Sequence, residues 1–141
     1  MNTEPDDKQL IAAAETGNLA ALQDWLTSQP ALLQWRSHDG DTLLHLACWQ
    51  KQLDLVPWLV NAGADVNAQG WLQRTPLHYA VNEGSERSVL LVRLLLQHGG
   101  QPRLRDTLGN TVADWARVEM HGDALRSVLR ELGEPLTGVR P

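Results

Sequence analysis

The sequence predicts an all-α fold, a short α-solenoid built from successive helical repeats. The first observation is a phrase that occurs twice, as Thr-Leu-Leu-His-Leu-Ala at residues 42–47 and as Thr-Pro-Leu-His-Tyr-Ala at residues 75–80, 33 positions later. A third, altered copy begins 36 positions further on, at Thr111. Bulky apolar segments follow the first two copies, and a period in this range is typical of units that stack into an array.

Composition limits the kinds of protein that this chain can be. The 141 residues are 43% apolar, and the net charge of -5 opposes attraction to a phosphate backbone, so we expect no nucleic-acid partner. The single cysteine cannot form an internal disulfide, and the first residues lack the pattern of a secretory signal. The longest apolar run, 89–96, is far too short to cross a bilayer. We therefore expect a cytoplasmic protein without a membrane partner.

A second landmark fixes the register of the copies. Residues 61–68 correspond to residues 97–104, 36 positions later, so a 33-residue period with one insertion of three residues fits both landmarks. The insertion must lie between Gly84 and Gly99, most simply at residues 85–88. We expect it to lengthen the loop between the two helices of the third repeat. Its polar composition fits either a specific contact or a plain surface extension.

The two phrases at one period resemble the ankyrin repeat, and the resemblance covers roughly residues 5–133. It implies units made of a β-turn finger followed by two antiparallel helices, in about four repeats at 5–37, 38–70, 71–106 and 107–133. The domain would span 1–133, with a flexible tail at 134–141. The first and last copies depart most from the pattern, which suits terminal caps that expose one face to water.

The start of each first helix is encoded locally. Thr75 can accept a hydrogen bond from a free amide as N-cap, and Pro76 suits the first helical turn, so a helix should begin near residue 76. Gly84 is expected to close this helix, as Gly17 would in the first repeat. Lys51 occupies the same place in the second repeat, so we expect a strained or different turn there.

The second helix of each central repeat carries the bulk of the core. Such stripes need a neighbouring repeat to cover them, and each buried side chain contributes about 1.5 to 3 kcal/mol, so packing between repeats outweighs any single cap. The stripe residues are Leu53, Leu55, Val56, Leu59 and Val60, then Leu91, Val92, Leu94, Leu95 and Leu96.

An alternative reading is an enzyme or a metal-binding module that uses His45, Cys48 and His78. In the ankyrin family the histidine of the repeated phrase is structural, and this resemblance favours structural roles for His45 and His78. Cys48 fills a position where neighbouring helices need a small residue. No metal-ligand spacing, nucleotide-binding glycine loop or EF-hand spacing is present, so we expect no cofactor and no metal.

The resemblance also implies a binding surface, because in ankyrin arrays the finger tips and the exposed face of the first helices form a concave groove for partners. Carried over by position, the tips are His38, Asp39 and Asp41; Trp71, Leu72 and Arg74; and Thr107, Leu108 and Asn110. The helical groove positions are Glu15 and Thr16, Trp49 and Gln50, Asn82 and Glu83, and Val118 and Glu119.

Six tryptophans against one tyrosine and no phenylalanine is an unusual balance. Three are assigned to packing within helices, namely Trp25, Trp58 and Trp115, and Trp35 is ambiguous. Trp49 and Trp71 fall on the predicted groove, where tryptophan is a frequent interface hot spot. The other interpretation is that both fold back over neighbouring turns.

We therefore predict a non-catalytic protein-binding module, an adaptor or regulator. The predicted contact residues are Trp49, Gln50, Trp71, Leu72, Arg74, Asn82, Glu83, Asp39 and Asp41. Acidic residues would rim the groove, namely Asp39, Asp41, Glu15, Glu83 and Glu119, interrupted by Arg74. The partner is expected to be a protein that offers an apolar anchor and basic residues.

Overall fold

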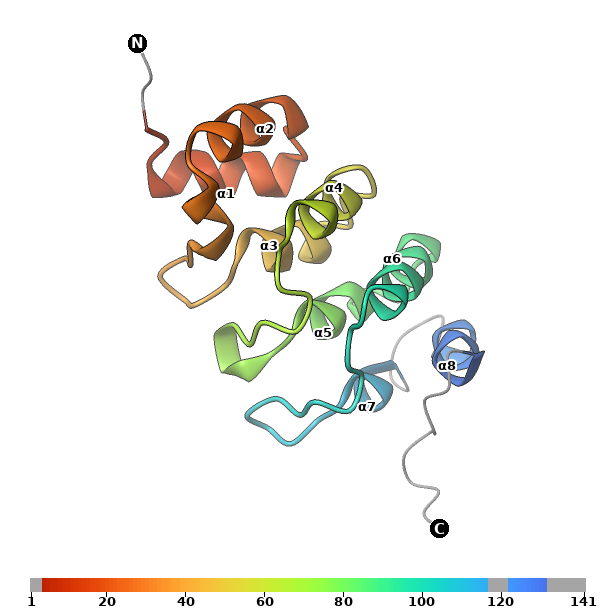
Figure 1. The fold of residues 1–141 in the computed structure, drawn as a ribbon. Coiled ribbons are helices and arrows are strands. Elements are labelled where there is room, and N and C mark those ends of the chain that lie inside the picture. Colours follow the sequence, from red (N-terminus) through yellow and green to blue (C-terminus); the bar gives the residue numbers. More distant parts are fainter. Residues whose placement is uncertain (1–3, 117–121, 132–141) are drawn as a thin grey trace.

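The computed structural model describes residues 4–116 and 122–131, and it confirms the all-α solenoid (Figure 1). The helices form four consecutive pairs: α1 (Asp7–Thr16) with α2 (Leu19–Ser28), α3 (Leu43–Trp49) with α4 (Leu55–Ala62), α5 (Pro76–Val81) with α6 (Glu86–Gln97), and α7 (Val112–Ala116) with α8 (Gly122–Glu131). Short 3-10 helices, η1 (Pro30–Gln34) and η2 (Trp71–Gln73), precede the second and third pairs. The exact repeat boundaries stay a prediction, and the predicted tail at 134–141 lies outside the described residues.

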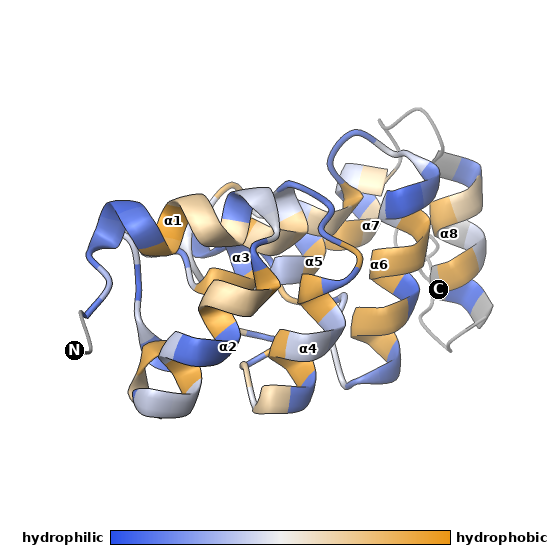
Figure 2. Ribbon diagram, turned by 90° about the horizontal axis from the view of Figure 1, so that it is seen from above, coloured by the Kyte–Doolittle hydropathy of each residue, from blue (hydrophilic) through white to orange (hydrophobic). Residues whose placement is uncertain are grey.

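The pairs stack in register. Helix α1 packs on α3, α3 on α5 and α5 on α7, which makes one row, and α2, α4, α6 and α8 form a second row beside it (Figure 2). The loops that lead into α3, α5 and α7 project from the same side of the stack as fingers (Figure 1). Within the described residues, none of the helices is both long and apolar enough to span a membrane.

Each first helix begins at a side-chain cap that the sequence specifies locally. Thr42 and Thr75 are the N-caps of α3 and α5, and each accepts a hydrogen bond from the backbone N–H of a histidine three residues later. That histidine accepts in return from the N–H of the threonine, so each pair forms a capping box. The first helix uses Asp6 for the same purpose, and its partner is the glutamine at position 9.

The predicted stripes are the core. The side chains that lose all or nearly all contact with water are Leu55, Val56, Leu59, Leu91, Val92 and Leu95, and the partly buried residues that pack against them are Leu53, Val60, Leu94 and Leu96. They join the small residues Ala47, Cys48 and Ala80 of the first helices in one continuous cluster. Packing between repeats therefore supplies the core, as the sequence predicts.

Two local expectations are wrong. Helix α5 ends at Val81, and Gly84 lies two residues beyond its C-cap, in a left-handed turn with a φ of 57°. The insertion lengthens a helix and not a loop, because Ser85 caps α6 and the next residues form its first turn. Helix α6 has 12 residues where α4 has 8. Serine is a preferred N-cap residue, which suits a helix start at this place.

The expectation of an unusual turn at Lys51 is confirmed. Lys51 takes the left-handed conformation with a φ of 56°, yet its side chain is buried. Its Nζ donates hydrogen bonds to the carbonyl oxygens of Trp49, at 3.0 Å, and Tyr79, at 3.2 Å. Since an ammonium group is costly to bury without acceptors, these two carbonyls explain how lysine is accommodated where glycine is usual.

Candidate functional site

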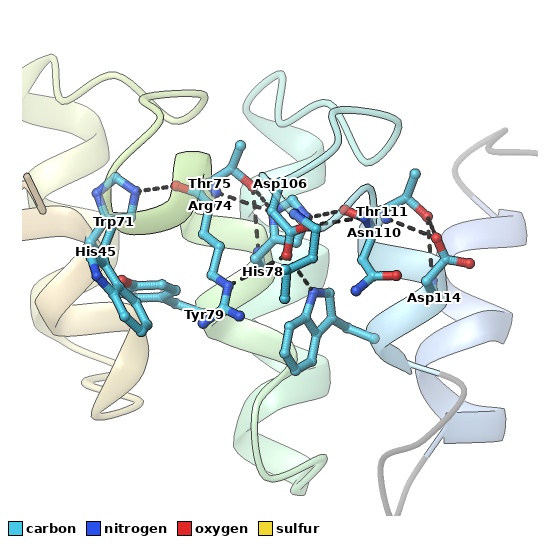
Figure 3. Close-up of polar contacts among 12 residues, drawn as sticks. His45, Trp71, Arg74, Thr75, His78, Tyr79, Asp106, Asn110, Thr111 and Asp114 are labelled. Atoms are coloured by element: carbon cyan, nitrogen blue, oxygen red, sulfur yellow. Dashed lines mark hydrogen bonds and ion pairs between the residues drawn. The ribbon is translucent and has the colours of Figure 1, made fainter.

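Two histidines, His45 and His78, each link one finger to the repeat that precedes it. The Nδ1 of His45 accepts from the N–H of Thr42 at 3.1 Å, which leaves Nε2 to donate to the carbonyl of Arg74 at 2.8 Å. His78 repeats the arrangement and donates to the carbonyl of Asn110 at 2.9 Å (Figure 3). Burial lowers the pKa of both rings, although the carbonyl bonds raise it in part. Both histidines therefore favour the neutral form and have structural partners.

Cys48, the third residue of the alternative enzyme or metal-binding hypothesis, is also in a structural position. Cys48 is fully buried in the core, and burial raises the pKa of its thiol to about 12. A thiol in such surroundings is not a nucleophile at neutral pH, because the thiolate is the reactive form. Among the described residues, no group of three or more histidine, cysteine, aspartate or glutamate side chains is placed to hold a metal ion.

Asp41 does not lie at the exposed finger tip where the sequence places it. Its side chain is 8% exposed, and both carboxylate oxygens accept from the hydroxyl of Tyr79, at 2.8 and 2.9 Å. One of them also accepts from the backbone N–H of Trp71 at 3.0 Å. The expectation that Asp41 is a rim residue is therefore wrong, because a tyrosine from the next repeat covers it. Burial and the Asp41 carboxylate raise the pKa of Tyr79, which stays a hydrogen-bond donor.

Around this network the structure forms a hollow of about 280 Å³ between α1, α3, α5 and the second and third fingers. Its lining residues are Glu15, Asp39, Asp41, Leu46, Trp49, Trp71, Arg74 and Tyr79. Five of them were predicted as contact residues from the sequence, and Glu15 was predicted as a groove and rim position. The structure thus brings residues from three repeats to one place on the groove side.

The two predicted tryptophans are half exposed in this hollow. Trp49 is 43% exposed and Trp71 is 46% exposed, values that are high for large aromatic side chains. The ring of Trp49 meets Tyr79 edge to face at 5.3 Å, and Lys51 lies 5.8 Å from the Trp49 ring centre. Each tryptophan therefore rests partly on its neighbours and presents the remainder to the solvent.

Arg74 forms the side of the hollow toward the fourth repeat. Its guanidinium lies 5.1 Å from the ring centre of Trp71 and 4.7 Å from that of Trp115. It also pairs with Asp106 at 3.4 Å (Figure 3). Asp106 in turn accepts from the indole N–H of Trp115 at 3.1 Å. Arg74 is thereby fixed, and a smaller hollow of about 40 Å³ continues past it between Trp49 and Trp115.

The remaining predicted contact residues do not line the hollow. Gln50 is exposed just after α3, Leu72 is half-buried in the third finger, and Glu83 is exposed in the turn after α5. Asn82 lines the smaller hollow. The groove positions Val118 and Glu119 lie outside the described residues.

The sequence interpretation missed two residues of the hollow. Leu46 and Tyr79 both line it, and they occupy the same place in the two copies of the repeated phrase, directly after the histidine. That shared position was a usable signal. The packing assignments of Trp25, Trp58 and Trp115 agree with their partial burial. The ambiguous Trp35 is half-buried, and its indole donates to Asp7 at 2.9 Å.

The fold and this surface define a helical-repeat protein of the solenoid class. A family model for the ankyrin repeat matches residues 39–71 and again residues 72–107. The chain belongs to the ankyrin repeat family.

Similar curated proteins include the serine/threonine-protein kinase VIK of Arabidopsis thaliana, 39% identical, over 62% of this chain and 19% of its own length. The E3 ubiquitin-protein ligase Ufd4 of Drosophila melanogaster is 33% identical over 95% of this chain and 5% of its length. The palmitoyltransferase AKR1 of Kluyveromyces lactis is 36% identical over 75% of this chain and 14% of its length. The chain thus spans about a fifth or less of the length of each.

Proposed function

We propose that the chain is a non-catalytic protein-protein interaction module, an adaptor or regulator that binds its partner through the concave groove and the finger tips. The observation that carries this proposal is the hollow in which Trp49 and Trp71 are both nearly half exposed. Half-exposed tryptophans beside a hollow are typical anchors of protein interfaces, because a partner that covers them removes much apolar surface from water.

The relatives support a binding role over a catalytic one. Their names describe three different reactions, while the segment they share with this chain is a small part of each. A segment common to a kinase, a ligase and an acyltransferase does not specify any one of those reactions. We therefore assign no reaction to this chain, and the burial of Cys48 and the bonds of His45 and His78 support that choice.

The charges of the groove suggest the kind of protein that binds. Glu15 and Asp39 line the hollow, Glu83 is exposed in the turn after α5, and the net charge is -5. We propose a partner segment with an apolar anchor and basic residues, in the cytoplasm, and no nucleic acid. The proposed contact residues are Trp49, Gln50, Trp71, Leu72, Arg74, Asn82, Glu83 and Asp39.

The test is a selection of binders from a randomised peptide library displayed on phage, followed by affinity measurements on three variants. Trp49→Ala and Trp71→Ala should each weaken the selected binders about tenfold or more. Leu90→Ala is the matched control, because Leu90 is 54% exposed but lies on α6, outside the hollow. Affinities that stay within about twofold for both tryptophan variants, with all proteins shown to be folded, would remove the groove from the binding site.

The catalytic alternative has its own test, the rate at which a thiol reagent modifies Cys48 in the native protein. Since the thiol is buried and its pKa is raised to about 12, we expect protection until the protein unfolds. Rapid modification under native conditions would revive a chemical role for this cysteine.

A further inference from the structure

We propose that the hollow is a subsite for one basic side chain, an arginine or lysine of the protein partner, and this inference rests on the proposed function of the groove. The walls of the hollow are aromatic and aliphatic, from Trp49, Trp71, Tyr79 and Leu46. Glu15 and Asp39 also line the hollow, and each carries a carboxylate. An arginine or lysine has a long apolar stem and a charged head, so it matches both parts at once.

Glu15 and Asp39 are the carboxylates available to a guest. Asp41 also lines the hollow, but its oxygens are already occupied by the Tyr79 hydroxyl and the Trp71 N–H. Within the described residues, no hydrogen bond or ion pair engages the carboxylate of Glu15 or of Asp39. Glu15 comes from α1 and Asp39 from the second finger, so they approach a guest from two different repeats.

The cation that already lines the hollow does not cancel this charge. Arg74 is paired with Asp106, whose side chain is fully buried, and the guanidinium is held against Trp115. The hollow therefore retains the negative charge of Glu15 and Asp39. Arg74 also shows that these surroundings accept a guanidinium on an indole face, since it lies 5.1 Å from the ring centre of Trp71.

A neutral apolar anchor is the main competing occupant. It would gain from Trp49, Trp71 and Leu46 but would leave two carboxylates partly covered and without a partner, which is unfavourable. A basic side chain avoids that cost, and its attraction to the indoles and carboxylates adds to the affinity. The charge of the lining therefore favours the basic occupant.

The experiment compares peptides that differ in charge but hardly in shape. Acetylated and amidated Gly-Arg-Gly is paired with its citrulline counterpart, and Gly-Lys-Gly with its norleucine counterpart. Dissociation constants are taken from the shifts of the Trp49 and Trp71 indole N–H resonances at low salt. We expect the basic peptides to bind about fivefold or more tightly than their neutral counterparts, and the ratio to shrink as salt is added.

Charge-only variants locate the effect. The double variant Glu15→Gln with Asp39→Asn should bring the affinity of the arginine peptide close to that of the citrulline peptide and leave the latter unchanged. Asp24→Asn, at an exposed position on α2, is the control and should change neither.

Each other outcome overturns the inference in a distinct way. Equal affinity of charged and neutral peptides at the two indoles would show an apolar anchor site, and the proposed function would stand. Basic peptides that shift neither indole would remove the subsite, and the phage selection would then decide the proposed function by itself. Ratios unchanged in the double variant would assign the preference to other charges.

Discussion

The second and third fingers share one hydrogen-bonded frame but differ in their turns. In the second, the N–H of Ser37 donates to the carbonyl of Asp41 at 2.8 Å, and in the third the N–H of Gly70 donates to the carbonyl of Arg74, also at 2.8 Å. The turn of the second finger has a glycine in the left-handed region, Gly40, with a φ of 98°.

The third finger has no glycine at that place. Leu72 and Gln73 both adopt positive φ, at 56° and 59°. This conformation costs about 1–2 kcal/mol for each residue other than glycine, and such strain persists only where the surroundings enforce it. The strained finger is also the one that presents Trp71 at the hollow. The repeat therefore fixes the hydrogen-bonded frame, while the turn inside the frame differs from finger to finger.

The largest effect is expected at the base of the third finger. A Cβ at Gly70 would run into the Asp41 carboxylate and stand about 3.0 Å from the His45 ring, so Gly70→Ala should cost about 2–4 kcal/mol of unfolding free energy. A Cβ at Gly40 meets nothing closer than 3.8 Å, so Gly40→Ala should cost only the left-handed strain, about 1–2 kcal/mol. Urea unfolding measures both, and equal losses would contradict the close approach at Gly70.

The hydrogen bonds of His45 and His78 to the following fingers should make the stability of the protein depend on pH. The folded pKa of His45 and of His78 lies below the ordinary value of 6.5, chiefly through burial, so the unfolded chain binds more protons below that pH. The contribution of these two histidines to the unfolding free energy should therefore be fully present above about pH 6.5. It should fall as the pH decreases from there toward their lowered pKa values in the folded protein.

Removing one link should remove part of this pH dependence. His78→Asn should lower stability at pH 7 but reduce the slope between about pH 6.5 and 5 by roughly half, since one buried imidazole of the two remains. Unfolding curves at several pH values measure the slope, and imidazole proton resonances titrate each ring directly. Ring pKa values at or above 6.5 in the native protein would contradict the buried, neutral links.

A smaller effect is expected where the two fingers carry opposite charges at one position. Asp41 bonds to Tyr79, whereas Arg74 reaches on to Asp106 and Trp115. Arg74→Lys should cost about 1–2 kcal/mol, because an ammonium cannot stack between two indoles and pair with the buried carboxylate in the same way. Thermal unfolding measures the loss, and an unchanged midpoint would show that the stack contributes nothing.

The smallest effect, and the only stabilising one, is expected in the turn of the third finger. Gln73→Gly should raise the unfolding free energy by about 0.5–1 kcal/mol, because relief of left-handed strain exceeds the entropy that glycine adds to the unfolded chain. Gln23→Gly, inside α2, is the control and should lower it by about 1 kcal/mol. A loss at both positions would mean that the third finger is not strained.

Local signals were the ones that the sequence allowed us to interpret. The helix starts at Thr42 and Thr75 and the unusual turn at Lys51 depend on residues close in sequence. The resemblance to ankyrin repeats placed Trp49 and Trp71 on one surface. Periodicity also identified the core, because stripes that one helical pair cannot cover require a neighbour.

Features that depend on contacts between repeats could not be predicted from the sequence. Asp41 was expected in solvent because nothing near it in sequence shows that Tyr79, 38 residues later, donates to it. The insertion was expected to lengthen a loop, whereas Ser85 caps a longer helix. The pairing of Arg74 with Asp106 and Trp115 depends on how the third finger meets the fourth repeat.

Whether a partner binds at the hollow can be measured directly on the six indole N–H groups. Trp49 and Trp71 line the hollow, while Trp25 and Trp58 pack partly buried on the second row of helices. On addition of a selected binder, we expect the resonances of Trp49 and Trp71 to shift and those of Trp25 and Trp58 to stay unchanged. Shifts of Trp25 and Trp58 with Trp49 and Trp71 unmoved would place the binding site on the opposite row and rule out binding at the hollow.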